Sequence, residues 1–250
     1  MCGRYVSAAE MDDLIDEFAI DQADEELPAP SWNVAPTDPV PAVLERLSSD
    51  QADRPGEAVR KLRPLHWGLV PSWAKDRSIG SRMINARVET VAEKPAFRKA
   101  FTARRCLLPA DGYFEWYDTG QLSPPSRAGN RKPVKQPYFL HRADGGTLAM
   151  AGLYEYWRSA TGEWHLSCTV ITTRAEDAAG RIHDRMPMII DRDAWDDWLD
   201  PLRTDADDAL ELLQVVTPTA LEIYPVSPAV GSVRNNGPEL LDRVPATGEG

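Results

Sequence analysis

Thr147-Leu-Ala-Met-Ala-Gly-Leu-Tyr-Glu-Tyr156 and Trp164-His-Leu-Ser-Cys-Thr-Val-Ile-Thr-Thr173 are two runs rich in β-branched, aromatic and other apolar residues. Their length and composition are typical of β-strands. Further strands are predicted on both sides of them, at residues 41–47, 59–67, 104–109, 112–117, 137–142, 186–190 and 221–226. These strands, with only short helical segments among them, predict an α+β fold with a mainly antiparallel, barrel-like β core flanked by short helices.

Helical spacing of apolar residues first occurs between Ser7 and Phe18, where Ser7 and Glu10 also have the spacing of a capping box. Short helices are also expected at residues 95–101, 175–180, 191–199 and 204–213. The polar residues 48–57 are expected to join two strands as a hairpin. Proline, glycine and polar residues predict irregular structure in three other segments, which are residues 21–39, a loop at 118–136 and a flexible tail at 241–250.

The chain has 250 residues, enough for one well-buried core, and a single domain is expected over residues 1–250. Its 39 acidic and 28 basic side chains give a net charge of −11. This balance excludes a general attraction to nucleic acid, so any contact with nucleic acid must come from a local basic cleft. There is no signal-like segment, and no apolar run approaches the length of a membrane span, which favours a soluble cytoplasmic protein.

The three cysteines lie far apart in the chain, which argues against a disulfide framework and indicates a reducing compartment. Cys106 and Cys168 lie in strand-like apolar runs and are expected to be buried and inert. Cys2 differs, because removal of Met1 would leave a free α-amine beside its thiol. With an aldehyde, such an aminothiol can form a Schiff base and then a five-membered thiazolidine. The alternative is an exposed, frayed terminus.

Two stretches place charged side chains in unusual settings. Asn85, Arg87 and Glu89 alternate, so they would share one side of an extended segment, as either a functional site or a solvated strand face. Glu115 lies among four aromatic residues in the stretch Gly112–Tyr117. Surrounding rings would raise the pKa of its carboxyl group, as a general acid or base requires, whereas strict alternation would turn it outward.

His183 is followed by Asp184 and Arg185, and histidine is the side chain best suited to moving protons near neutral pH. The alternative is a histidine of the surface or core without a catalytic role. The other three histidines lie in strand-like runs and are interpreted as structural. No two histidines have the helical spacing of metal ligands, so neither a metal site nor a cofactor is expected.

Trp67-Gly-Leu-Val-Pro-Ser-Trp73 places two tryptophans around a glycine and a proline. Their rings would either pack in the core or stack on unpaired bases. Ser232-Val-Arg-Asn-Asn-Gly237 is either a loop that grasps a nucleic-acid backbone through Arg234 or a turn with a solvated arginine.

Together these stretches resemble the SRAP family, the SOS response-associated peptidases. The resemblance extends over about residues 2–240 and rests on six motifs in order: Cys2-Gly-Arg-Tyr5, Asn33-Val-Ala-Pro36, Trp67-Gly-Leu-Val-Pro-Ser-Trp73, Ile84-Asn-Ala-Arg-Val-Glu89, Phe114-Glu-Trp116 and Ile182-His-Asp-Arg-Met-Pro187. It implies a single α+β domain with a β-barrel-like core and a basic groove. It further implies that the chain binds single-stranded DNA and traps abasic sites as a thiazolidine.

The resemblance also implies roles for individual residues. Cys2 would be the covalent nucleophile and Asn85 would hold the cysteine or the sugar. Glu115 would act on protons at the sugar, and His183 would assist ring opening and Schiff-base chemistry. The residues expected to contact DNA are Arg4, Pro36, Trp67, Trp73, Arg87, Arg185 and Arg234. The resemblance assigns no role to the 118–136 loop.

The sequence hypothesis is therefore a monomeric DNA-repair protein that crosslinks Cys2 to abasic sites in single-stranded DNA and shields them. It would act in the cytoplasm, on the nucleoid when bound to DNA, and no protein partner is indicated. One alternative is an N-terminal-nucleophile cysteine peptidase that uses Cys2 with His183. Another is a single-stranded DNA-binding module in which Cys2 is incidental.

Overall fold

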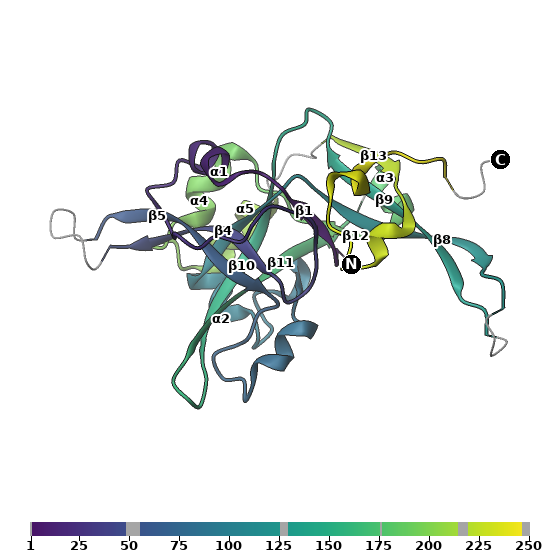
Figure 1. Ribbon diagram of the computed structural model, residues 1–250. Helices are drawn as coiled ribbons and strands as arrows, with labels where there is room; N and C mark the ends of the chain where they lie inside the picture. Colours follow the sequence, from purple (N-terminus) through teal and green to yellow (C-terminus); the bar gives the residue numbers. More distant parts are fainter. Residues whose placement is uncertain (1, 49–55, 126–129, 176, 215–219, 247–250) are drawn as a thin grey trace.

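The computed structural model describes residues 2–48, 56–125, 130–175, 177–214 and 220–246, and a five-stranded barrel lies at its centre (Figure 1). Around the barrel the order is β11 (Trp164–Arg174), β10 (Leu148–Arg158), β7 (Arg105–Ala110), β4 (Pro39–Leu47) and β5 (Ala58–Trp67). Neighbouring strands are antiparallel except at the closure, where β5 and β11 are parallel and Trp67 lies beside Cys168. The predicted α+β class with a mainly antiparallel, barrel-like core is confirmed.

A second sheet of five strands carries the N-terminal segment. Its order is β13 (Leu221–Pro225), β9 (Pro133–Arg142), β8 (Gly112–Leu122), β1 (Tyr5–Ser7) and β3 (Ser31–Val34). Because β1 lies between β8 and β3, the chain is held on both sides directly after Cys2. Three short strands extend the barrel sheet: β2 (Gln22–Ala23) beside β5, and β6 (Asn85–Arg87) and β12 (Arg185–Pro187) beside β11.

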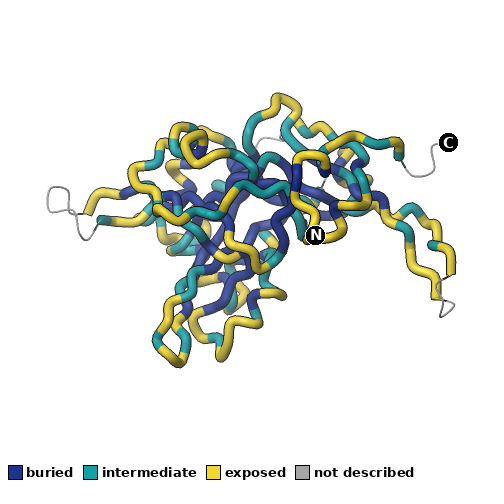
Figure 2. The backbone as a smooth tube through the Cα atoms, in the orientation of Figure 1, coloured by how far each residue is buried: buried dark blue, intermediate teal, exposed yellow. Residues whose placement is uncertain are grey.

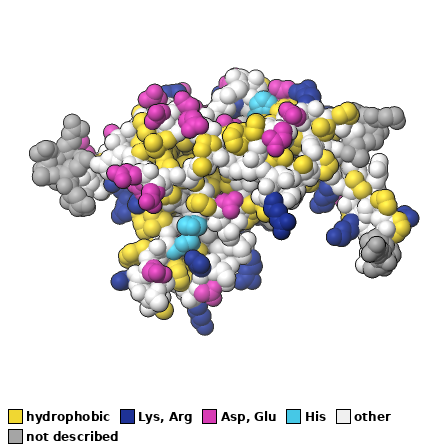
Figure 3. Space-filling view, in the orientation of Figure 1, with side chains coloured by type: hydrophobic (Ala, Val, Ile, Leu, Met, Phe, Trp, Pro, Cys, Tyr) yellow, Lys and Arg dark blue, Asp and Glu magenta, His cyan; other side chains and the backbone are white. Residues whose placement is uncertain are grey.

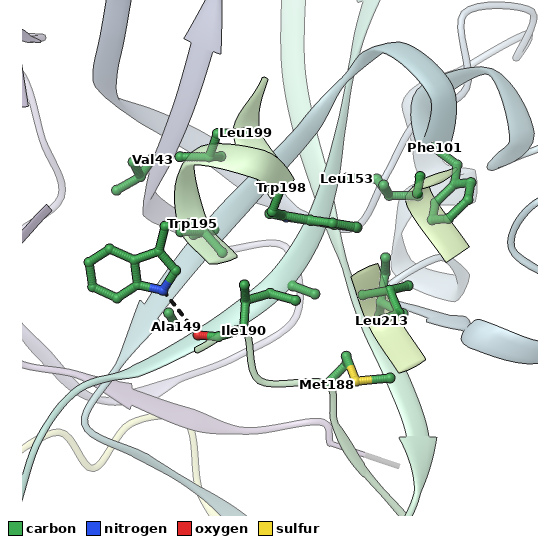
Figure 4. Close-up of a cluster of buried hydrophobic side chains, with 14 of the residues drawn as sticks. Val43, Phe101, Ala149, Leu153, Met188, Ile190, Trp195, Trp198, Leu199 and Leu213 are labelled. Carbon is green, nitrogen blue, oxygen red and sulfur yellow. Dashed lines mark hydrogen bonds between the residues drawn. The ribbon is translucent and has the colours of Figure 1, made fainter. Parts of the chain in front are cut away.

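Helices cover one side of the barrel (Figure 1). They are α1 (Met11–Phe18), α2 (Arg98–Ala103), α4 (Trp195–Leu199) and α5 (Ala206–Gln214). Their apolar faces meet barrel side chains in one core cluster that includes Val43, Leu153 and Trp198 (Figure 4). The two indole N–H groups there are satisfied by backbone carbonyls, Trp195 by Ile190 at 3.0 Å and Trp198 by Cys106 at 2.9 Å.

A second buried cluster combines side chains of the barrel strands with side chains of the N-terminal sheet. It contains Cys2, Tyr5, Trp67 and Tyr113, all fully or almost fully buried. Figure 2 marks the backbone at the centre of the molecule as buried. The remaining helix, α3 (Asp177–Ile182), packs against β8 and β13. Short 3-10 helices complete the chain: η1 (Arg77–Arg82), η2 (Val88–Thr90), η3 (Arg192–Ala194), η4 (Pro228–Gly231) and η5 (Pro238–Leu241).

The predicted capping box is wrong, because tertiary pairing holds Ser7 in a strand. Ser7 ends β1 and lies opposite Ser31 of β3. The helix begins at Met11, and its N-cap, Glu10, makes no side-chain capping bond. The other predicted helices are present within a few residues, and the 191–199 helix is divided into η3 and α4. The predicted strand at 186–190 is β12, with Ile189 forming only an isolated bridge to Met150.

Two segments predicted to be irregular contain paired strands. Within residues 21–39 the structure has β2 and β3. Within 118–136, β8 continues to Leu122 and β9 begins at Pro133, so most of that stretch is a projecting hairpin (Figure 1). Hydrogen bonding across the two strands outweighs the low strand propensity of this polar sequence. Residues 126–129 lie outside the described part of the chain.

Two further predictions concern segments that the structure describes only in part. The predicted connection 48–57 joins β4 and β5, which pair as an antiparallel hairpin, although residues 49–55 lie outside the described chain. The predicted flexible tail is hydrogen-bonded at its start, since Val244 donates to the Pro225 carbonyl at 3.0 Å and Arg243 bridges to Val226. Residues 247–250 lie outside the described chain.

Candidate active site at Cys2

The first strand places Cys2 in the interior. Tyr5 of β1 lies opposite Tyr113 of β8, and the backbone N–H of Phe114 donates to the Arg4 carbonyl at 2.9 Å. The Cys2 carbonyl accepts a hydrogen bond from the Asn85 side-chain amide at 2.7 Å. Cys2 is consequently 0% exposed, which excludes the alternative of a frayed, exposed residue at this position.

Asn85 reaches Cys2 because β6 is paired with the barrel. Asn85 lies beside Val170 of β11, and the preceding Ile84 carbonyl accepts from both the Val170 N–H, at 3.1 Å, and the Trp67 indole N–H, at 2.9 Å. The amide oxygen of Asn85 is buried and has no hydrogen-bond partner within the described structure. The amide nitrogen of Asn85 therefore holds Cys2, while the amide oxygen remains available to accept a hydrogen bond.

Glu115 is buried beside Cys2. It is 3% exposed, and burial raises the pKa of its carboxyl group to about 7. Its register partner on β9 is Tyr138. The sequence left open whether Glu115 faces solvent or a walled interior, and the structure selects the interior. A carboxyl group with a pKa near neutrality is suited to both giving and taking a proton.

The thiol of Cys2 is distinguished from the other two thiols by its neighbours. Burial raises the pKa of all three. Only at Cys2 does the charge of Glu115 raise the thiol pKa further, which shows that the two groups lie close together. Cys106 and Cys168 are fully buried, as expected for inert structural thiols.

Sequence reasoning missed two tyrosines in this cluster. The hydroxyl oxygens of Tyr5 and Tyr113 are buried without hydrogen-bond partners among the described residues. Burial is the largest cause that raises both tyrosine pKa values, and Cys2 adds to each. Tyr5 lies in a quoted motif and Tyr113 two residues before Glu115, but the two residues lie opposite each other only because β1 pairs with β8.

His183 follows α3 and has its ring orientation set locally. The Arg185 backbone N–H donates to its Nδ1 at 3.0 Å, and the Asp184 Oδ1 atom lies 3.0 Å from the same nitrogen. Burial lowers the pKa of His183, so the neutral ring is favoured near pH 7. Asp184 contributes to raising the pKa of Glu115, which places this turn near the carboxyl group.

The predicted DNA-contacting arginines differ in availability. Arg4 donates to the Asn33 side chain at 2.8 Å and to the Val230 carbonyl at 3.0 Å, so it ties the N-terminal strand to η4. Arg185 is buried and pairs with Glu89 at 2.6 Å. Arg87 and Arg234 are exposed. Two of the four guanidinium groups are thus engaged inside the protein.

The other expected contacts are divided in the same way. Trp67 is fully buried and meets Tyr5 edge to face, with 5.0 Å between ring centroids. Of the two interpretations of this ring, core packing rather than stacking on bases is therefore the one that the structure supports. Trp73 is 59% exposed and Pro36 is half-buried. An open hollow of about 590 Å³ lies beside Arg87, Glu89, Asp184 and Arg185.

The alternation of Asn85, Arg87 and Glu89 does not continue as predicted, because β6 ends at Arg87 and Glu89 lies in η2. Within the described ranges there is no cluster of three or more metal-ligating side chains. No helix in the described part of the chain is long and apolar enough to cross a membrane.

The fold and site define a class of domain in which a closed barrel and a second sheet enclose a cysteine of the first strand beside a carboxyl group. The family model described as "SOS response associated peptidase (SRAP)" matches residues 1–233. The chain belongs to this family.

Relatives from bacteria and animals match along most of the chain. The Bacillus subtilis "Abasic site processing protein YoqW" is 40% identical over 246 residues, covering 97% of this chain and 99% of that protein. The mouse "Abasic site processing protein HMCES" is 31% identical over 245 residues, covering 85% of this chain and 64% of that protein.

Solved structures with the same fold come from two bacteria. A Bacteroides thetaiotaomicron protein superposes with a TM-score of 0.76 at 23% identity, covering 97% of this chain and all of that one. A phage-related protein from Bordetella bronchiseptica gives a TM-score of 0.66 at 28% identity, covering 90% of this chain and 94% of that one.

Proposed function

We propose that this protein processes abasic sites in single-stranded DNA by bonding covalently to them through Cys2, after removal of Met1. The observation that carries the proposal is the burial of Cys2 beside Glu115, with its carbonyl held by Asn85. The names of the relatives support abasic-site processing as the role. An abasic site is in equilibrium with an open aldehyde, which is the group that an aminothiol captures.

The chemistry proceeds in two bond-forming steps. The α-amine of Cys2 attacks the aldehyde carbon to give a carbinolamine. The carbinolamine hydroxyl takes up a proton and leaves as water, which gives a protonated Schiff base. The thiol sulfur then adds to the same carbon and releases its proton, which closes a five-membered thiazolidine. The balance is one aminothiol and one aldehyde giving one thiazolidine and one water.

Burial of the thiol determines which group acts first. Because its pKa is raised, the Cys2 thiol stays protonated and is a weak nucleophile until a cation forms nearby. The amine therefore attacks before the sulfur. The positive charge of the Schiff base then favours the thiolate at the moment when ring closure needs it.

Glu115 is the group best placed to move the protons. In its protonated form it can donate to the departing hydroxyl of the carbinolamine, and its carboxylate can then accept the thiol proton. Its pKa of about 7 makes both forms available near neutral pH. His183, neutral near pH 7, would assist opening of the sugar ring. Asn85 holds the backbone of Cys2 and offers its free amide oxygen to the sugar.

Binding of DNA should rest on a small number of basic contacts. Arg87, Arg234 and the exposed ring of Trp73 supply the available guanidinium and stacking surfaces. The net charge of −11 opposes approach of a polyanion. Affinity for single-stranded DNA should weaken as salt rises, with a slope set by these few contacts. We expect a monomer that acts in the cytoplasm on the nucleoid.

The test mixes purified protein, shown by intact mass to lack Met1, with an oligonucleotide that carries one abasic site. Wild type should give a species that survives denaturation and has the summed mass less one water. Cys2→Ala should give none, while Cys106→Ala, which removes another buried thiol, should give the wild-type yield. A wild type without adduct, or an undiminished yield in Cys2→Ala, would overturn the proposal.

The family description names a peptidase, so peptidase activity is a second candidate function. A cysteine peptidase that uses Cys2 with His183 would turn over an amide substrate many times and accumulate only a transient acyl-enzyme. The thiazolidine accumulates in a one-to-one ratio. Counting product per protein molecule separates the two. A binding module without chemistry would show equal DNA affinity and no adduct in wild type and Cys2→Ala.

A further inference from the structure

A second polar hollow lies next to the Trp67–Trp73 stretch, outside the cluster that encloses Cys2. Its volume is about 480 Å³, and two imidazoles, a guanidinium and three hydroxyl groups line it: His66, His165, Arg77, Thr37, Ser78 and Ser81. No acidic residue lines it among the described residues, although the net charge of the chain is −11. Cationic and hydroxyl groups without a carboxylate fit an anion.

The two histidines meet because the barrel closes between their strands. His66 of β5 lies beside Ser167 of β11 in the parallel pairing, and His165 is two residues earlier on β11. Their ring centroids are 4.5 Å apart. Burial lowers the pKa of His165, and His66 and Arg77 lower it further. A bound anion would act in the opposite direction and favour the protonated form of His165.

The acidic residues on the flanking segments do not neutralise this cluster. Asp76, before η1, accepts a hydrogen bond from the Ser78 backbone N–H at 2.8 Å. Asp38, before β4, accepts from the Ala35 backbone N–H at 2.9 Å. On β10, the neighbour of His165 is the uncharged Trp157, whose ring lies 6.5 Å from it. No ion pair engages Arg77 in the described structure.

The floor of the hollow is a close approach of two backbone segments. A Cβ atom on Gly68 would lie 2.6 Å from the Gly80 carbonyl oxygen, and one on Gly80 would lie 2.5 Å from the Gly68 oxygen. On the rim, Thr37 has a φ of 77°, a conformation rare for a β-branched residue, and its N–H donates to Trp67 at 2.7 Å. The hollow is therefore shaped by the backbone before any ligand arrives.

The hollow adjoins the Cys2 site through Trp67. This residue lines the hollow, packs its ring on Tyr5 and donates its indole N–H to Ile84, the residue before Asn85. Thr37 follows Pro36, and the exposed Trp73 ends the same loop that begins at Gly68. In the view of Figure 3, histidine side chains lie beside basic ones on the lower lobe, where Figure 1 shows the β10–β11 hairpin.

We propose that this hollow binds a phosphate of the DNA strand whose lesion reaches Cys2, with Arg77, His66 and His165 as its partners. The inference rests on the proposed function, because the strand is brought there by the Cys2 site. The shared chemistry is that of a phosphate anion, and we assign it to the phosphodiester backbone because the lining residues continue directly from Pro36 and Trp67. DNA affinity should then rise as the pH falls, since binding takes up protons.

The experiment measures affinity for an undamaged single-stranded oligonucleotide by fluorescence anisotropy at about pH 6 and about pH 8, so that no covalent step contributes. Wild type should gain roughly two- to fivefold more affinity on acidification than the double variant His66→Gln/His165→Gln. The matched control is His141→Gln, a histidine of β9 that pairs with Glu222 and should leave the wild-type gain unchanged. Equal gains in wild type and the double variant would overturn the proposal.

A second readout uses the salt dependence of the same binding. Arg77→Gln should reduce the slope of log affinity against log salt by about 0.7, the value for one phosphate contact on a single strand. Arg82→Gln, on the same 3-10 helix but outside the lining, should keep the wild-type slope. An equal reduction in both variants would mean that only general charge matters, which also overturns the proposal.

Two further measurements are needed. One distinguishes free phosphate from DNA phosphate as the ligand, and the other distinguishes failure of the hollow from failure of the proposed Cys2 function. If titration with inorganic phosphate shifts the NMR signals of His66 and His165 while DNA affinity is the same in wild type and the double variant, the hollow is a free-phosphate site and the DNA assignment fails. If wild type forms no adduct with abasic DNA yet shows the pH effect on undamaged DNA, the proposed function fails and the hollow stands.

Discussion

Glu115 and Glu89 lie in neighbouring regions of the molecule, and their environments move the pKa of a carboxyl group in opposite directions. Beside Cys2, burial raises the pKa of Glu115 to about 7. At the hollow of about 590 Å³ that Arg87 and Arg185 line, hydrogen bonds from Arg185 lower the pKa of Glu89. One carboxyl group is therefore poised to exchange a proton near neutral pH, and the other is ionised there and holds an arginine.

The same contrast applies to the basic side chains. Beside Cys2, burial raises the pKa of Glu115 by more than the nearby charge and hydrogen bonds lower it. At the hollow of about 590 Å³, Arg185 donates to Glu89 and Thr172, whereas Arg87 and Arg174, which also line it, are exposed. Under the proposed function, the reacting groups and the DNA contacts belong to adjacent but separate regions, so substitutions should separate their effects.

The largest expected effect is on the rate of adduct formation. Glu115→Gln should slow it by about 10²–10⁴-fold, the usual contribution of a positioned proton carrier. The ratio of wild-type to variant rate should be constant below about pH 6 and fall above about pH 7 as the wild-type carboxyl group loses its proton. Single-turnover kinetics over this range measure it. Glu89→Gln is the control, and an equal slowing there would remove the contrast between the two glutamates.

The second effect is on stability. The folded-state pKa of Glu115 is raised above its unfolded value, so its stabilising contribution is fully present below pH 4.5 and is lost as the pH rises through about 7. Relative to Glu115→Gln, wild type should lose roughly 2–3 kcal/mol of unfolding free energy between these limits. Urea unfolding at several pH values measures the difference. A wild type that gains stability over this interval would contradict the burial of an ionising carboxyl group.

The third effect distinguishes a structural arginine from an exposed one. Arg185→Gln should destabilise the fold by about 2 kcal/mol, because Glu89 and the buried Thr172 oxygens lose their partner. Part of this loss should vanish at low pH, where Glu89 is protonated and the ion pair is absent. Thermal unfolding of Arg185→Gln and Arg87→Gln provides the comparison. Equal destabilisation by both substitutions would show that the exposed Arg87 is also part of the framework.

The smallest effect is on noncovalent binding. Arg87→Gln should leave unfolding unchanged and reduce the salt slope for undamaged single-stranded DNA by about 0.7. Titrations at several salt concentrations measure the slope. Arg98→Gln is the control, because Arg98 lies on α2 and does not line the hollow beside Arg87. A slope equal to that of wild type would place the phosphate contacts elsewhere.

Much of the fold could be predicted from local sequence, and the failures share one cause. The β10 and β11 strands were predictable because each carries its own run of β-branched and aromatic residues. The end of the β8–β9 hairpin and the β3 strand have no such signal, and they are strands because partners lie alongside them. Ser7 has the sequence of a helix cap, yet its strand pairing holds it in β1.

The candidate site was predictable as a list of residues but not as an arrangement. Cys2, Asn85, Glu115 and His183 stood out by residue type and setting, whereas the hydroxyl groups of Tyr5 and Tyr113 had no signal of their own. Residue type also could not distinguish the arginines, since an engaged guanidinium and an exposed one look alike in a sequence. The His66 and His165 pair was interpreted as structural because each histidine alone lies in a strand-like run.

By itself the sequence determined the strand-rich α+β class, the separation of Cys2 from the two inert thiols, and the short motifs that resemble the SRAP family. These are properties of local composition and order. Only the tertiary structure decided that Cys2 and Glu115 are buried together, that Arg4 and Arg185 are used internally, and that Trp67 is core. The physical reason is that pKa values and the availability of donors depend on burial and on partners, which come together only when the barrel closes.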